Sequence, residues 1–258
     1  MIRPMQFAGS FYPSSSLELE SMIEAFLKNA TPQKPDGKIQ AIISPHAGYI
    51  YSGLVAAYGY KLLQNNQYKE VILLGPSHQV PCQGLAICDF NEWETPLGNV
   101  PVSKNNESIL KYKMVQLLNK AHIAEHSIEV QLPFLQTVLK KFSILPITTG
   151  SIEKHKEVAE TLNKYSKDTT FIIVSSDLSH YLPYDDAQRI DNKTTESILD
   201  GELDISHDRA CGADGILILM HLAKMNNWKA TLLDYRNSGD TAGDKQAVVG
   251  YASIAFTE

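Results

Sequence analysis

The chain has 258 residues, of which 43% are hydrophobic and 20% are charged, and its formal net charge is −6 at pH 7. This length permits a substantial buried core, and the composition is too apolar for a disordered chain. The acidic balance, without a long run of lysines or arginines, argues against nucleic acid as a partner.

The first residues, the apolar runs and the cysteines do not suggest export or membrane insertion. The first residues, MIRPMQFAGSFYP, lack the apolar stretch and the small-residue cleavage site of a secretory signal. No apolar run approaches the ~20 residues that span a bilayer. Cys82, Cys88 and Cys211 have no CxxC spacing, which argues against a disulfide framework and against a zinc ribbon. We therefore expect a cytoplasmic protein with no membrane partner.

Apolar, β-rich runs alternate with segments of helical period along the chain. Strands are predicted at 39–43, 71–74, 142–147, 171–174 and 248–256. Helices are predicted at 17–27, 54–63, 109–118, 158–165 and 216–225. A further apolar stripe from Ile128 to Phe142 predicts a helix with Ser127 as its N-cap, and WETPLGNVPV (93–102) predicts a hairpin.

This order of elements indicates the fold class. Strands that alternate with helices are typical of βαβ units, so we expect an α/β fold with a mostly parallel central sheet flanked by helices. The chain has no fixed-period repeat and no long linker, which predicts a single domain over residues 1–258.

Three predicted strands lead directly into short polar turns that contain histidine. The segments are AIISPHAG, ILLGPSHQ and FIIVSSDLSH, and they place His46, His78 and His180 just beyond the carboxyl ends of the strands. Ligands of open α/β sheets bind at this edge, because the loops converge there. A lone histidine is more often a packing or loop residue, but three in equivalent positions indicate a site.

The residue types favour a metal over other ligands. No GxSxG, Walker A or GxGxxG motif follows a strand, which argues against a nucleophile elbow or a bound nucleotide. Neutral imidazole is the commonest metal ligand, so His46 and His78 need one more donor to form a site. The candidates for that third donor are Asp177, His180, Glu125, His126 and Cys211.

Each of the other candidates also has an ordinary structural interpretation. Cys211, in HDRACGADGI before a predicted helix, fits a thiolate ligand or a small buried residue. Asp177 and His180 share a turn and fit either an acid–base pair or an Asx-type turn with a surface histidine. His126 fits a pocket residue or a helix cap.

In the segments that carry these residues, the chain resembles the Memo-like family. The matching segments, in the order expected for that family, are AGSFYP (8–13), SPHAGYIYSG (44–53), LGPSH (74–78), ETPLG (94–98), EHSIEVQLPFL (125–135), SSDLSHY (175–181), NSGDTAGDK (237–245) and VVGYASIAF (248–256). The family is similar to the extradiol ring-cleaving dioxygenases that use non-haem iron. The resemblance therefore implies a central mixed sheet flanked by helices, with an extradiol-dioxygenase-like pocket at one edge.

The resemblance also implies a ligand set. Memo-like proteins bind a metal through two histidines and a cysteine, which correspond to His46, His78 and Cys211 here. His180 and His126 correspond to the acid–base and substrate-binding histidines of the ring-cleaving relatives, and Asp177 lies beside His180. The relatives have a glutamate where this family has cysteine. The resemblance implies Fe(II) as the metal, and because a thiolate is softer than a carboxylate, copper and zinc are alternatives.

Three functions are consistent with such a pocket. The first is a non-haem iron oxidoreductase that acts on a small molecule with O₂. The second is a zinc-dependent hydrolase, and the third is a non-catalytic protein that binds a peptide or partner in the same pocket. The resemblance further implies binding of phosphotyrosine or partner-derived peptides, and association of microbial members with a radical-SAM protein.

Overall fold

We examined a computed structural model of the chain, which describes residues 1–64, 66–104 and 106–258. A large mixed sheet lies at its centre, with the strand order β10-β12-β2-β9-β3-β8-β4-β7 and with β11 paired to β12. Its strands are β2 (Ile39–Ser44), β3 (Glu70–Pro76), β4 (Leu85–Ile87), β7 (Val115–Leu117), β8 (Ser143–Thr149), β9 (Thr170–Ser175), β10 (His180–Leu182), β11 (Lys229–Asn237) and β12 (Val248–Thr257).

The four central strands β2, β9, β3 and β8 run parallel to one another. β12 joins β2 in antiparallel orientation on one side, and β4 joins β8 in antiparallel orientation on the other. The prediction of an α/β fold with a mixed sheet is confirmed, with the parallel strands in the middle and antiparallel pairs on both sides.

Side chains of the central strands alternate between the two faces, and both faces are apolar. Ile42 and Leu73 belong to one core cluster, whereas Ile43 and Leu74 belong to the other. Burial on both faces explains why these strands read as continuous apolar runs instead of alternating ones.

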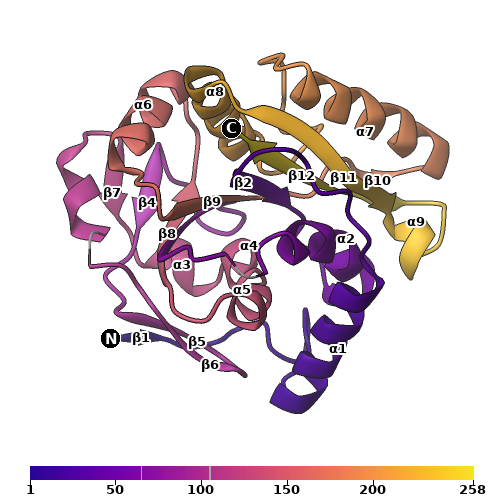
Figure 1. Ribbon diagram of the computed structural model, residues 1–258, viewed down its shortest axis with the longest axis horizontal. Helices are drawn as coiled ribbons and strands as arrows, with labels where there is room; N and C mark the ends of the chain where they lie inside the picture. Colours follow the sequence, from indigo (N-terminus) through magenta and orange to yellow (C-terminus); the bar gives the residue numbers. More distant parts are fainter. Residues whose placement is uncertain (65, 105) are drawn as a thin grey trace.

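Helices cover both faces of the sheet (Figure 1). One layer contains α1 (Ser16–Asn29), α2 (Tyr49–Lys61), α3 (Lys120–Ile123), α4 (His126–Glu129) and α5 (Leu132–Val138). The other contains α6 (His155–Tyr165), α7 (Tyr184–Leu199) and α8 (Ala213–Asn226), and α9 (Ser238–Thr241) lies beside α2 and β12. Among the described residues, no helix is both long and apolar enough to cross a bilayer.

The N-terminal segment is fixed to the body by one buried ion pair. Strand β1 (Ile2–Arg3) pairs with the hairpin of β5 (Glu92–Thr95) and β6 (Gly98–Pro101), which lies where the sequence predicts a hairpin. Arg3 and Glu129 are fully buried, and Arg3 Nη1 lies 2.5 Å from Glu129 Oε2. Glu129 also accepts hydrogen bonds from the Tyr12 hydroxyl and from the Phe7 backbone N–H.

Two of the predicted elements are wrong. Residues 109–118 do not form a helix but a 3₁₀ turn, η1 (Asn106–Lys111), and then strand β7. The predicted helix from Ile128 to Phe142 is two short helices, and Leu139 is already extended. Glu125, not Ser127, is the N-cap of α4, and its side chain accepts a hydrogen bond from the Ser127 N–H.

Candidate functional site

His46 and His78 follow β2 and β3 directly, and these strands lie on either side of β9 in the parallel sheet. Their imidazole ring centroids are 5.3 Å apart. His126 begins α4 and joins them, so that one donor nitrogen of each of the three histidines lies within 4.8 Å of the other two. The predicted convergence of His46 and His78 at the sheet edge is what the structure shows, and these three histidines could hold a metal ion.

The tautomer of His46 follows from its hydrogen bonds. The Ser175 hydroxyl donates to the Ser127 carbonyl at 2.6 Å, which uses its single proton. Ser175 Oγ must therefore accept from His46 Nδ1, which lies 2.9 Å away. Gln131 donates to the same oxygen at 2.7 Å. Because Nδ1 carries the proton, His46 presents an unprotonated Nε2 to the pocket.

His78 is oriented in the same way by Glu125. Burial favours the neutral form of this carboxyl, but hydrogen bonds from the His78 side chain and from backbone N–H groups outweigh it and lower its pKa to about 2. The ionised carboxylate accepts from His78 Nδ1 at 2.9 Å and from the His78 backbone N–H at 2.6 Å. The Nε2 atom of His78 then carries the lone pair that can bind a metal ion. Carboxylate–histidine pairs of this kind orient ligands in metal sites.

His46 and His126 are neutral over the physiological pH range. Burial, with the neighbouring His78, lowers the pKa of His46 to about 3. Burial, with His46, lowers the pKa of His126 to about 4. Both imidazoles therefore keep an unprotonated nitrogen, which a metal ligand requires.

Cys211, in the loop before α8, lies against His46, but among the described residues the group of donor atoms within 4.8 Å of one another contains the three histidines without Cys211. Its Sγ lies 3.2 Å from His46 Nε2, and it accepts a hydrogen bond from the Asp177 backbone N–H at 3.3 Å. Gly212 allows this close approach, since a Cβ there would lie 2.6 Å from the Ser176 side chain. Burial and the nearby Asp177 carboxylate raise the pKa of the Cys211 thiol well above its ordinary value. The thiol is thus protonated unless a cation binds beside it.

Asp177 and His180 lie at the same sheet edge, where His180 is one of the charges that act on the Asp177 carboxyl. Asp177 is buried, and its Oδ1 accepts from the His46 backbone N–H at 2.8 Å. Burial raises the pKa of this carboxyl. In the described part of the chain no hydrogen bond joins Asp177 to His180, which begins β10 and is half-buried. Asp177 therefore holds the His46 backbone in place.

Sequence reasoning missed two residues that support the cluster, Ser175 and Gln131. Gln131 is fully buried, and its amide is oriented by the Tyr60 hydroxyl, which donates to Gln131 Oε1 at 2.6 Å. Its position between the apolar residues Val130 and Leu132 is a signal that could have indicated it. Ser175 carried no comparable signal, because its role depends on segments far away in the sequence.

Among the other histidines, His122, His155 and His207 do not belong to the group of three. His155 and His207 each contact one oxygen of Asp214, at 2.6 and 3.0 Å. His122 is fully buried and lies 3.1 Å from the Ala86 carbonyl through its Nε2. These residues pack the structure or lie on its surface.

His122 is expected to make stability depend on pH. Burial lowers its pKa to about 4, so the folded protein keeps it neutral. Below the unfolded value of about 6.5 only the unfolded chain takes up the proton, and stability should fall by up to about 1.4 kcal/mol per pH unit as the pH drops from about 6.5 to about 4. His122→Gln keeps a hydrogen-bond donor for the Ala86 carbonyl and removes the titrating group. Urea unfolding of the metal-free proteins at several pH values should show a shallower decline for the variant. If the free energy of unfolding declined equally with pH in the wild type and the variant, His122 would not be the cause of the decline.

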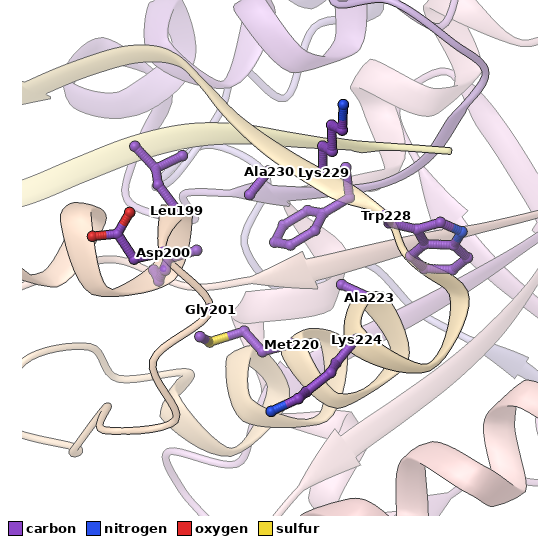
Figure 2. Close-up of a pocket in the computed structure, with 11 residues that line it drawn as sticks. Leu199, Asp200, Gly201, Met220, Ala223, Lys224, Trp228, Lys229 and Ala230 are labelled. Carbon is purple, nitrogen blue, oxygen red and sulfur yellow. The ribbon is translucent and has the colours of Figure 1, made fainter.

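A separate hollow of about 470 Å³ lies between the end of α7, the end of α8 and the start of β11 (Figure 2). Its wall includes Met220, Trp228 and Phe256, with Lys224 and Asp200 among the charged residues. No histidine or cysteine is among the described residues that line it. Without a group of donors, this hollow does not compete with the histidine cluster as a candidate site.

The fold and the cluster together define the class of protein: an α/β protein whose central parallel strands bring a possible metal-binding group of histidines to one edge. Comparison with known proteins then identifies the family. The model of the family described as "Memo-like protein" matches residues 3–255, and the chain belongs to this family.

The relatives agree with this assignment over their full length. The chain is 38% identical to "MEMO1 family protein TV1383" of Thermoplasma volcanium, over 98% of each chain. It is 36% identical to a MEMO1 family protein of Nitrosopumilus maritimus, over 99% of this chain and 100% of the relative. The predicted resemblance to Memo-like proteins is confirmed.

A solved structure shares the fold. The uncharacterized protein JW3007 from Escherichia coli K12 matches with a TM-score of 0.56 and 14% identity, over 84% of this chain and 99% of that chain. This likeness concerns the fold alone. The implied relation to ring-cleaving dioxygenases stays a prediction.

Proposed function

We propose that the chain binds a divalent transition metal through His46, His78 and Cys211, with Fe(II) as the first choice and copper or zinc as alternatives. We further propose that it is an oxidoreductase that acts with O₂ on a small molecule. The observation that supports the metal site most directly is that the tautomers of His46 and His78 are both fixed. Ser175 and Glu125 each hold a proton on Nδ1 of their histidine, so that His46 and His78 both offer Nε2.

The surrounding residues have distinct tasks in this proposal. Bound iron would supply the redox chemistry that O₂ requires. Cys211 gives up its proton and its sulfur becomes the charged donor. His180, half-buried at the sheet edge, exchanges protons with the substrate. Phe7 and Phe11 pack on His126, with ring centroids 5.6 and 4.7 Å from it, and keep water from that side of the cluster.

The test uses protein loaded anaerobically with Fe(II) and then mixed with air-saturated buffer that contains catechol as a bidentate probe. We expect retention of iron and iron-dependent consumption of O₂. His180→Ala should leave the iron content unchanged but lower the rate about 100-fold or more, since a general acid–base group contributes about 10²–10⁴. His155→Ala, which changes a histidine outside the cluster, is the matched control. Protein that retains neither iron nor copper would contradict the proposal.

Glu125→Gln tests the support of His78. The amide cannot serve as the charged acceptor for both the ring and the backbone N–H of His78, so the favoured tautomer is lost. We expect metal affinity to fall about 10–100-fold, as for other partners that orient a ligand. Competition with a chromophoric chelator measures the change. Glu157→Gln, which alters an exposed carboxylate that pairs with Lys154, should bind metal like the wild type.

Binding of a peptide in the same pocket is a second candidate. Tyr181, next to His180, is 76% exposed and has a φ of 58°, which is a strained backbone region for a bulky residue. Such strain often occurs at ligand-binding positions. Titration with a tyrosine-phosphorylated peptide separates the two functions. Binding that survives both His46→Ala and His78→Ala would favour this candidate over metal chemistry.

A further inference from the structure

His78 and His126 present their rings in the same direction. Nδ1 of His78 lies 2.9 Å and Nδ1 of His126 lies 3.4 Å from the same oxygen, Oε1 of Glu125. The two rings are stacked, with centroids 4.7 Å apart and an angle of 17° between their planes. The two rings therefore lie side by side next to Glu125, and one donor nitrogen of each lies within 4.8 Å of the other.

His46 faces this stacked pair almost symmetrically. Its ring centroid lies 5.3 Å from that of His78 and 5.2 Å from that of His126. The angles between its plane and theirs are 78° and 85°. His126 is therefore placed like His78 relative to His46, and the donor nitrogens of all three lie within 4.8 Å of one another.

His126 is also held firmly in this position. Phe11 lies against its ring at a centroid distance of 4.7 Å, and Phe7 meets it edge-on at 5.6 Å. The segment that carries both phenylalanines is fixed by Glu129, which accepts from the Phe7 backbone N–H at 2.8 Å. A residue that must swing to move protons does not need such packing, whereas a metal ligand gains affinity from it.

We propose that His126 is itself a metal ligand, so that the cation is held by three imidazoles, with the Cys211 thiolate as the fourth donor beside His46. This inference rests on the proposed function, because it presupposes a metal at His46 and His78. A set of three nitrogens and one sulfur suits Co(II), Zn(II) and copper at least as well as Fe(II). It also leaves His180 as the histidine of the pocket that exchanges protons.

The test is anaerobic titration of the metal-free protein with Co(II), followed by visible and near-ultraviolet absorption. The wild type should show strong d–d bands of a four-coordinate site together with a thiolate-to-cobalt band. His126→Ala should keep the thiolate band, because Cys211 remains, but its d–d bands should weaken as water enters. Added imidazole should restore them. Affinity should fall by more than the roughly 10–100-fold that loss of an orienting partner costs. His155→Ala serves as the control.

The outcomes separate this inference from the proposed function. A wild type that binds no Co(II), Fe(II) or copper contradicts the proposed function itself. A wild type that binds while His126→Ala shows the same spectrum and affinity overturns only the ligand role of His126. X-ray absorption of the zinc-loaded wild type gives an answer that needs no variant: three imidazoles and one sulfur are expected, and two imidazoles would overturn the proposal.

Discussion

Glu129→Ala is expected to lower the free energy of unfolding by about 3–5 kcal/mol, because it leaves a buried charge without its partner. Arg3 and Glu129 are both fully buried, and their side chains are 2.5 Å apart. The carboxylate also accepts from the Tyr12 hydroxyl at 2.6 Å and from the Phe7 N–H at 2.8 Å. The variant would lose all of these contacts at once. Urea unfolding at pH 7 measures the change.

A matched control shows whether burial is the cause. Lys154 and Glu157 form an ion pair at 2.8 Å, but their side chains are 69% and 51% exposed. Lys154→Met should therefore lower the free energy of unfolding far less than Glu129→Ala does. If Glu129→Ala cost as little as this control, the Arg3–Glu129 pair would contribute nothing that depends on its burial. The same variant should also loosen the packing of Phe7 on His126, since Glu129 fixes that segment.

The central strands could be predicted from sequence for a clear physical reason. Strands such as β2 and β3 are covered by helices on both faces, so nearly every residue is apolar and the run ends abruptly at the polar turn. That same ending placed His46 and His78 at one edge. The position of these two histidines thus followed from the rule that the carboxyl ends of parallel strands share an edge.

Other elements carried no such signal. Helix α7 buries Asp191, Thr194, Thr195 and Ser197 beside only two apolar residues, Ala187 and Ile198, so no run of large apolar residues marks it in the sequence. The region 109–118 has apolar residues at helical spacing, but Val115 pairs with Leu85 of β4 instead. In this segment a long-range pairing outweighed local preference.

The finer features of the site depend on contacts between distant segments. The tautomer of His46 follows from a serine 129 positions away in the sequence, and Arg3 meets a glutamate 126 positions away. His126 was expected near the pocket, yet its stacking on His78 could not be inferred from its place at a helix start. Patterns in a single sequence predict which segments lie together. They do not predict which side chains form hydrogen bonds or which ring nitrogen carries the proton.

Cys211→Ser is expected to remove most of the metal from protein purified anaerobically and to change how many protons are released when metal binds. In the metal-free protein, burial and Asp177 raise the pKa of the Cys211 thiol, so it carries a proton at neutral pH. The pKa of His46 is lowered to about 3, so that ligand has no proton to lose at Nε2. Metal binding at pH 7.5 should then release about one proton per ion, and that proton comes from Cys211.

Two measurements check this expectation on the same samples. Metal analysis compares the content of the wild type with that of Cys211→Ser, and titration with Zn(II) in weakly buffered solution with a pH indicator counts the protons. Cys88→Ser, which changes a buried cysteine that does not belong to the group of three histidines, is the control and should behave like the wild type. A serine hydroxyl at this site stays protonated, so the variant should release almost no proton and bind zinc weakly. Unchanged metal content with one proton still released would mean that Cys211 is no ligand, and that the three histidines hold the ion without it.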